Sequence, residues 1–351
     1  TNDSCLVTQE IKKIYLEKGK LFVHDNDPFL KVFDANTGKY LYNIGRKGQG
    51  PGELSFLGYI DINPGNEQIL LSWSKHTHRF DFKGRFIANV ERPESDTIEL
   101  HSNIAMLDDS LYVAGCRPNN DHQEYAAIVF DTNKNSISSL LSYRDMIQHP
   151  TIKTWSPYRQ CGFFYRMGED VRYYRGICDT IYTYNREEQQ FEPVFSFDFG
   201  KHLSHFNFNP GQENPELIQI LEEAVSENPP HIYIDFQTIK SSPEPFKEIV
   251  YKFDQRREVV NNNIYGIYDK QKQELHFLLQ PIPGVRGLKN DLDGGIPFWS
   301  KSISSDFQML DYHHASRFLE LAEKVANPGK SFSAFVQTCA EEDNPVVIIV
   351  E

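Results

Sequence analysis

The glycine-rich segment 44–54, IGRKGQGPGEL, contains the residue types of a phosphate-binding loop. A P-loop places a lysine and a serine or threonine directly after its last glycine and continues into a helix. Here Lys47 precedes Gly48, and no helical pattern follows Glu53, so the helix N-terminus that would bind the anion is missing. We therefore interpret the segment as a link between two groups of strands, in which glycines permit positive φ angles and Pro51 limits flexibility.

Asp291 and Asp293, in NDLDGGIPFW, are the candidate metal ligands. Two carboxylates at this spacing could supply oxygen ligands to calcium, the one cofactor that the sequence suggests. The EF-hand pattern would add a third ligand and a glutamate at its twelfth position, and both are missing here. The alternative is a turn in which the aspartates accept hydrogen bonds from backbone amides.

His76 and His78 are two residues apart in an expected strand, so their rings should lie on one face. A zinc site needs three or four ligands, and a third would have to come from another part of the chain. His313 and His314 are adjacent and should diverge. For all four histidines the alternative is a solvated or hydrogen-bonded ring.

Sequence motifs for nucleophilic or zinc-protease chemistry are missing: the chain has no G-x-S-x-G elbow and no H-E-x-x-H helix. A binding site could still be assembled from loops that are distant in the sequence. Aromatic and arginine side chains suit sugars or peptides, although packing between sheets uses the same aromatic residues. The candidate ligand-binding residues are Arg46, Trp73, His78, Arg117, Arg159, Arg166, Arg172 and Trp299.

The composition indicates a folded, strand-rich protein. The chain has 351 residues, 39% of them hydrophobic, with 18 Tyr and 25 Phe but only 4 Met. Its formal charge of −13 argues against nucleic acid or an anionic membrane surface as partner. The five cysteines show no CxxC spacing. Cys161 and Cys178 could face each other across a hairpin and form a disulfide, or they could be separately buried thiols.

A repeated pattern of short strands runs through the first 200 residues. Segment 13–45 contains three apolar runs separated by turn signals, and the same order returns in 59–91, 103–141 and 163–200. Repeats of about 40 to 50 residues built from four strands are typical of propeller blades.

After Gly200 the pattern predicts an amphipathic helix over 214–229, then strands over 231–280, a second helix over 315–326 and a final buried strand over 344–351. We expect one all-β domain over 1–351, a six-bladed β-propeller with two short helical insertions. The final strand should share a blade with residues near the N-terminus, because a closed ring has no exposed edge. The predicted blades are 11–53, 54–97, 98–145, 159–200, 231–280 and 282–351.

Several of these segments resemble a known family. YLYNIGRKGQGPGEL with LFVHD and LKVFDANTGKYL, DTIYTYN with EPVFSFDFG, NDLDGGIPFWSKSIS and EEDNPVVIIVE are similar to six-bladed, NHL-like β-propeller lipoproteins of the Bacteroides-type cell envelope. Most members of this family have no assigned activity. The resemblance implies a periplasmic or outer-membrane-associated protein, attached to the membrane only by a lipid anchor upstream of Thr1.

Two functions follow from this reasoning. The first is a monomeric, non-catalytic binding or scaffold propeller that holds a small molecule, glycan or protein at one face. The alternative is a carbohydrate-active lyase or hydrolase with its site over the central channel. An enzyme should place two carboxylates, or a histidine and a carboxylate, within hydrogen-bond reach in one pocket.

Overall fold

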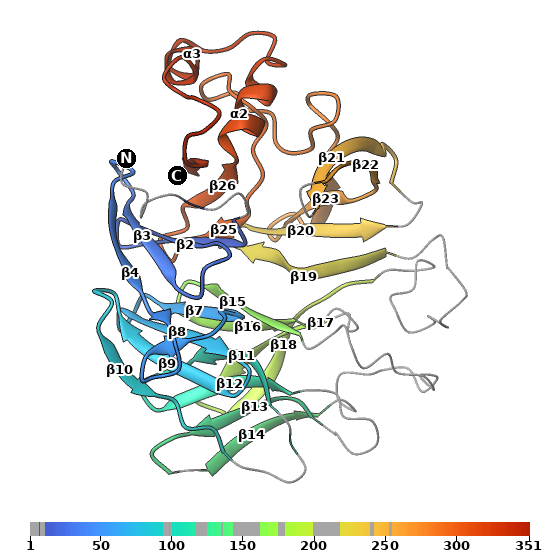
Figure 1. Ribbon diagram of the computed structural model, residues 1–351. Coiled ribbons are helices and arrows are strands. Elements are labelled where there is room, and N and C mark those ends of the chain that lie inside the picture. The colour runs from blue at the N-terminus through green and yellow to red at the C-terminus, as the bar shows by residue number, and fades with distance from the viewer. Residues whose placement is uncertain are drawn as a thin grey trace. The chain divides into compact units, whose positions relative to one another are not determined.

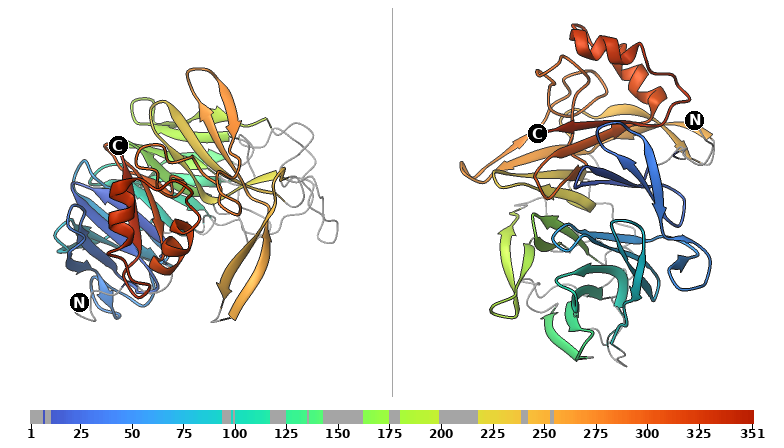
Figure 2. Two further views of the ribbon diagram at one scale, coloured as in Figure 1. Left: turned by 90° about the horizontal axis from the view of Figure 1, so that it is seen from above. Right: turned by 90° about the vertical axis from the view of Figure 1, so that its left-hand side faces the viewer.

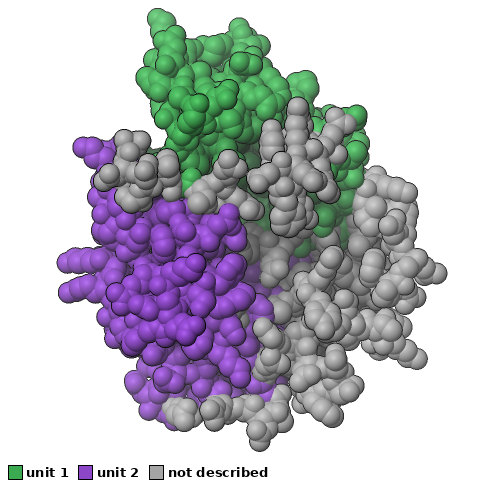
Figure 3. Space-filling view, viewed as in Figure 1, with its two compact units in different colours: residues 1–9, 214–351 green, residues 10–213 purple. Residues whose placement is uncertain are grey.

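The computed structural model of the protein describes residues 7, 11–93, 98, 100–116, 125–134, 136–142, 162–174, 180–198, 218–238, 242–252 and 255–351 (Figure 1). The chain divides into two compact units (Figure 3). Unit 1 comprises residues 1–9 and 214–351, and unit 2 comprises residues 10–213. None of the described helices is long and apolar enough to cross a membrane.

Unit 2 contains four four-stranded antiparallel sheets in its described residues, each built from strands that are consecutive in the chain. The first sheet is β1 (Lys13–Glu17), β2 (Lys20–His24), β3 (Leu30–Asp34) and β4 (Tyr40–Ile44). The second is β7 (Tyr59–Asn63), β8 (Gln68–Trp73), β9 (His76–Asp81) and β10 (Phe86–Asn89). The third is β11 (Leu100–Met106), β12 (Leu111–Cys116), β13 (Tyr125–Asp131) and β14 (Ser136–Ser142). The fourth is β15 (Phe163–Met167), β16 (Asp170–Tyr174), β17 (Thr180–Asn185) and β18 (Gln190–Ser196).

The core of unit 2 lies between neighbouring sheets. Apolar side chains of the first sheet form one cluster with those of the second, which buries the facing surfaces of both. Further clusters join the second sheet to the third and the third to the fourth. The cluster between the first and second sheets includes Phe22, Leu30, Val32, Ile44, Ile60, Ile62, Ile69, Leu71 and Phe80.

The first strands of the second and fourth sheets run in the same direction. Tyr59 Oη donates to the carbonyl oxygen of Phe164 at 3.1 Å, and two residues further along both strands Arg166 Nε donates to Asp61 Oδ1 at 2.9 Å. Strand β11 contacts both β7 and β15. Because each second strand is antiparallel to its first, β8 and β16 end where β7 and β15 begin.

Unit 1 contains a four-stranded and a three-stranded sheet in its described residues. The four-stranded sheet has the order β19 (Ile218–Glu227), β20 (His231–Thr238), β23 (Ile264–Asp269) and β24 (Glu274–Phe277). Between β20 and β23 the chain forms a two-stranded ribbon, β21 (Phe246–Lys252) and β22 (Gln255–Asn261) (Figure 2). The three-stranded sheet is β25 (Ser302–Ile303), β26 (Met309–His313) and β27 (Val346–Val350).

Two helices, α2 (Ala315–Ala322) and α3 (Lys330–Val336), connect β26 to β27. The rings of Phe318 and Phe332 pack edge to face at 5.8 Å and belong to a buried cluster that includes Val346 of the final strand. The predicted helix over 315–326 is therefore present, somewhat shorter, and α3 was not predicted.

The predicted helix over 214–229 is wrong, because residues 218–227 form strand β19. The pairing of β19 with β20 shifts register between Ile220 and Val225. This irregularity places both residues in the core although they are five apart, an odd spacing that a regular strand would direct to opposite faces. The resulting apolar pattern imitates the periodicity of a helix.

The fold is all-β, a six-bladed β-propeller, as the repeats predicted. Of the two predicted helical insertions, the described residues contain only the second, over 315–322. Within unit 1, the backbone N–H of Val7 donates to Asn344 Oδ1 at 2.9 Å, close to the start of β27. A blade shared by the two chain ends, the single-domain organisation and the blade limits stay predictions.

A buried carboxylate anchors the three-stranded sheet of unit 1. Asp311 of β26 is fully buried, and Lys301 Nζ and His313 Nε2 lie 2.8 and 3.2 Å from its oxygens. The backbone N–H of Trp299 also donates to Asp311 Oδ2, at 3.1 Å. Burial alone would raise the pKa of Asp311, but the charge of Lys301 and the hydrogen bond from His313 outweigh burial and hold this pKa well below its ordinary range.

This depressed pKa predicts an acid-sensitive contribution to stability. The Asp311 carboxylate stabilises the fold above its ordinary pKa of 3.8, and this contribution is lost as the pH falls below that value. Asp311→Asn should lower the free energy of unfolding at neutral pH by about 3–5 kcal/mol, because it removes one partner of a buried ion pair. Urea unfolding between about pH 7 and pH 3 should show a flatter acid dependence for the variant.

Asp306→Asn, at an exposed position before β26, is the control and should change the free energy of unfolding at neutral pH by no more than about 0.5 kcal/mol. Equal stability of Asp311→Asn and the unmodified chain at neutral pH would contradict this account.

Candidate functional site

The glycine-rich segment 44–54 folds around its own carboxylate. The backbone N–H groups of Gln49 and Gly50 donate to Glu53 Oε2 at 3.0 and 2.9 Å, and Arg46 Nε lies 2.7 Å from Glu53 Oε1. Strand β5 (Arg46–Lys47) pairs in parallel with β6 (Glu53–Leu54), so the segment closes on itself. It connects the first sheet to the second, as predicted.

Glu53 takes the position that a bound phosphate would need. A Cβ atom on Gly48 would lie 2.0 Å from Glu53 Oε2, so a side chain at position 48 would displace the carboxylate. The hydrogen bond from Gly50, helped by the charge of Arg46, lowers the pKa of Glu53 below its ordinary value. The amides of Gln49 and Gly50 thus bind an internal anion and make this segment a rigid connection.

An exposed aromatic pair, Phe56 and Trp73, lies beside this connection. Both residues are 40% exposed, and their ring centroids are 4.5 Å apart with an interplanar angle of 55°. Gly58 lies against the indole, since a Cβ atom there would be 2.8 Å from Trp73 Cε3. Trp73 ends β8 immediately before the turn to β9, in which Ser74 has a positive φ of 54°.

Cationic and imidazole groups surround the aromatic pair. Lys12 Nζ lies 5.1 Å from the centroid of the Phe56 ring. His76 is the strand partner of Trp73, and its ring stacks at 6.5 Å on that of His78. His78 is buried, with Nε2 3.0 Å from the carbonyl oxygen of Glu53, to which it must donate. The predicted residues Arg46, Trp73 and His78 are therefore brought together.

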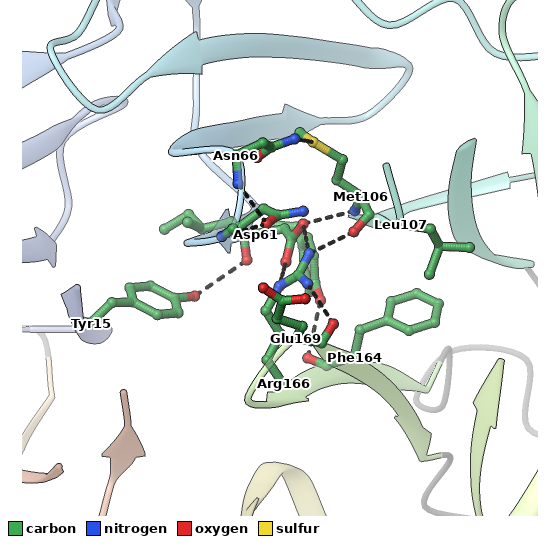
Figure 4. Close-up of polar contacts among 12 residues, drawn as sticks. Tyr15, Asp61, Asn66, Met106, Leu107, Phe164, Arg166 and Glu169 are labelled. Atoms are coloured by element: carbon green, nitrogen blue, oxygen red, sulfur yellow. Dashed lines mark hydrogen bonds and ion pairs between the residues drawn. The ribbon is translucent and has the colours of Figure 1, made fainter. Parts of the chain in front are cut away.

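Arg166, another predicted ligand residue, holds sheets together inside unit 2 (Figure 4). Its Nη2 atom donates to Asp61 Oδ2 at 2.8 Å and to the carbonyl oxygen of Met106 at 2.7 Å. The backbone N–H of Met106 in turn donates to Asp61 Oδ2 at 2.8 Å. One ion pair and the two backbone groups of Met106 thus join the first strands of three successive sheets.

Arg172 and Trp299, two further predicted ligand residues, contact other partners. Arg172 of β16 is buried, with Nη2 3.5 Å from Asp170 Oδ2. Trp299 belongs to unit 1, where it is buried and stacks on Tyr265 at 4.3 Å with an interplanar angle of 6°. Arg117 and Arg159 lie outside the described residues, and so do Cys161 and Cys178.

Asp291 and Asp293 belong to a tight turn in unit 1. Asp293 Oδ1 accepts the backbone N–H of Gly295 at 3.0 Å. Gly329 packs against this turn, since a Cβ atom there would lie 1.8 Å from the carbonyl oxygen of Asp293. The described part of the chain has no group of three or more His, Cys, Asp or Glu side chains able to hold a metal ion. Calcium binding at this turn stays a prediction.

Among the described residues, two histidines lie beside a carboxylate: the exposed His276 beside Glu274 at 3.4 Å, and His313 beside the buried Asp311 at 3.2 Å. Asp311 also accepts the backbone N–H of Tyr312 at 2.7 Å, in addition to its contacts with Lys301 and Trp299. Its oxygens are therefore occupied by several donors that hold it ionised, an arrangement that stabilises the sheet.

Sequence reasoning missed Phe56, Glu53, Asp61 and Asp311. A glutamate inside a glycine-rich run is the one signal that could have indicated an internal anion. Asp61 and Asp311 lie within apolar strands, where a buried acid implies a cationic partner but does not reveal which one.

The Asp61–Arg166 pair can be tested by a double-mutant cycle. Arg166→Gln should lower the free energy of unfolding by about 3–5 kcal/mol, because it leaves the Asp61 carboxylate buried without its counter-ion. Asp61→Asn combined with Arg166→Gln should cost less than the two single changes together. Urea unfolding measures all three variants.

Arg85→Gln removes a matched but exposed pair, in which Arg85 Nε lies 2.5 Å from Asp81 Oδ2, and should cost at most about 1 kcal/mol. Strict additivity of the Asp61 and Arg166 changes would contradict a coupling between these residues.

A pH titration followed through backbone amide signals tests whether Glu53 is the internal anion. The pKa of Glu53 lies below its ordinary value of 4.5, so its hydrogen bonds persist above that pH and are lost as the pH falls through the lower folded pKa. The ¹H–¹⁵N signals of Gln49 and Gly50 should shift with one midpoint below pH 4.5, the ordinary pKa of a glutamate. Glu53→Gln should abolish this transition; a midpoint at or above pH 4.5 would contradict the assignment.

The fold is similar to that of a solved structure. The crystal structure of a "Putative exported protein" from Bacteroides fragilis is similar with a TM-score of 0.68 and 19% identity, over 100% of this chain and 93% of that chain. A member of the DUF4221 family from Bacteroides vulgatus is similar with a TM-score of 0.46 and 11% identity, over 77% of this chain and 82% of that chain. No curated protein matches the sequence.

A family model described as a domain of unknown function, DUF4934, matches residues 1–351. The match covers the whole chain, including the glycine-rich connection, the aromatic pair and the C-terminal sheet with its two helices. The protein therefore belongs to the DUF4934 family.

Proposed function

We propose that the protein is a non-catalytic binding protein of the bacterial cell envelope that holds its ligand at the Phe56–Trp73 pair. The exposed position of this pair is the observation that carries the proposal. Binding of a ligand over two large exposed aromatic rings is favourable, because it removes their apolar surface from water. Because Gly58 and the ordered connection 44–54 fix their position, little conformational entropy is lost on binding.

The position of the aromatic pair in the fold also supports binding. Trp73 is the last residue of β8, and Phe56 precedes β7, so the pair lies at the end of the second sheet where its first strand begins. Functional residues are commonly placed on connections held by a rigid scaffold. The ligand at this surface would be a small molecule, a glycan or a segment of a partner protein.

The absence of catalysis is supported by the state of the acid at this surface. Glu53, a carboxylate of the connection beside the pair, accepts two backbone N–H groups and contacts Arg46. A general base needs a free lone pair directed at the substrate. Glu53 supplies charge balance and rigidity.

The cellular location is part of the proposal. The similarity to an exported protein of Bacteroides fragilis supports a location outside the cytoplasm. Attachment to the membrane through a lipid anchor upstream of Thr1 is the arrangement expected from the sequence resemblance.

A ligand screen with a turnover assay tests this function. Glycan and peptide arrays should yield a ligand that is recovered unchanged after incubation, and Trp73→Ala should weaken its binding about tenfold or more. Phe277→Ala, which removes another exposed aromatic side chain, in unit 1, should leave binding unchanged. Formation of a product, or a ligand whose binding is indifferent to Trp73→Ala, would contradict the proposal.

A further inference from the structure

The aromatic pair carries a local charge opposite in sign to that of the whole protein. The chain has a formal charge of −13, yet four exposed cations belong to the segments that form and flank the pair. We call them the basic rim: Lys12, Arg46, Lys47 and Lys75. Lys75 directly follows Ser74 in the turn after Trp73, and Arg46 and Lys47 form β5 of the glycine-rich connection.

Among the described residues, the acids near this end of unit 2 only partly offset the basic rim. Glu53 is the partner of Arg46 at 2.7 Å. Asp25 and Asp27, which follow β2, lie 2.5 and 2.7 Å from Lys31 Nζ, so this buried lysine is matched by acids of its own. Glu91 is exposed and follows Val90, whose backbone N–H donates to the carbonyl oxygen of Thr77, so it offsets one cation. With Lys12, Lys47 and Lys75 against Glu91, the described charge of these segments stays positive.

The geometry of the pair suits a sugar ring. The Trp73 indole contacts Gly58 and Phe56, and the residue remains 40% exposed. A pyranose presents an apolar C–H face that can stack on such a ring, while its hydroxyl and acidic groups extend sideways. Acidic groups at the edge of a stacked sugar would meet the basic rim, and they make charge-assisted hydrogen bonds with lysine.

On these grounds, which rest on the proposed binding function, we infer that the aromatic pair and the basic rim bind an anionic oligosaccharide, one whose rings carry carboxylate or sulfate groups. A short oligosaccharide would place its acidic groups only against the basic rim. A nucleic acid, which can also stack on aromatic side chains, would extend its phosphates over the strongly acidic remainder of the protein.

Calorimetric titration of the intact chain with a matched pair of probes tests this inference. Oligogalacturonate and its methyl-esterified form share the same ring, and only the first is charged. We expect oligogalacturonate, a sulfated tetrasaccharide, or both to bind. If oligogalacturonate binds, its methyl ester should bind at least about tenfold more weakly. A preference for one acidic probe distinguishes carboxylate from sulfate recognition.

Variants separate the two parts of the site. Trp73→Ala should weaken binding about tenfold or more, and Gly58→Val, which displaces the indole without removing it, should act in the same direction. Lys12→Gln with Lys75→Gln should reduce both the affinity and its dependence on salt, since screening acts on the rim. Phe277→Ala, in unit 1, is the matched control.

Three results would overturn the inference: equal binding of the methyl ester, tighter binding of a short oligothymidylate, or no binding of any acidic sugar. If a neutral glycan or a peptide binds and requires Trp73, the binding function stands and only the ligand class is wrong. If no ligand requires Trp73, the proposed function itself fails.

Discussion

A buried carboxylate and a half-buried guanidinium, those of Asp61 and Arg166, join two strands across 105 residues of chain. An ion pair removed from water stabilises only when its remaining hydrogen-bonding groups are satisfied. Here the N–H and the carbonyl oxygen of Met106 satisfy them, and they belong to the strand that contacts both partners. The geometry therefore constrains three sheets at once, and Tyr15 Oη adds the first sheet by donating to the carbonyl oxygen of Ile60 at 3.3 Å.

This constraint connects the fold to the proposed site. Because the first strands of the second and fourth sheets run in the same direction, their second strands end at the same end of unit 2. Trp73 occupies such a position. The connection 44–54 leads into the second sheet at this end and is held by Glu53, so the aromatic pair rests on two rigid supports. Arg166 contributes to the site by fixing the sheets that carry it.

Much of the fold could be predicted because its strands repeat with similar turns. The prediction failed at 214–229, where the register shift in β19 produces helical spacing in a strand. The site was harder to predict. The sequence does not reveal whether an arginine pairs with a buried acid of another sheet, as Arg166 does, or with an acid of its own connection, as Arg46 does with Glu53. Trp73 and Trp299 differ only in what packs over them, which depends on distant segments.

Native-state hydrogen exchange under increasing urea tests most directly whether the first-strand contacts make the sheets of unit 2 one cooperative body. Amides at the centres of the second strands, those of Leu70, Ala114 and Tyr173, report on three sheets. The account predicts that their opening free energies merge into a single value as urea rises. Separate opening of the sheet 163–196, at a lower free energy than the other two, would contradict it.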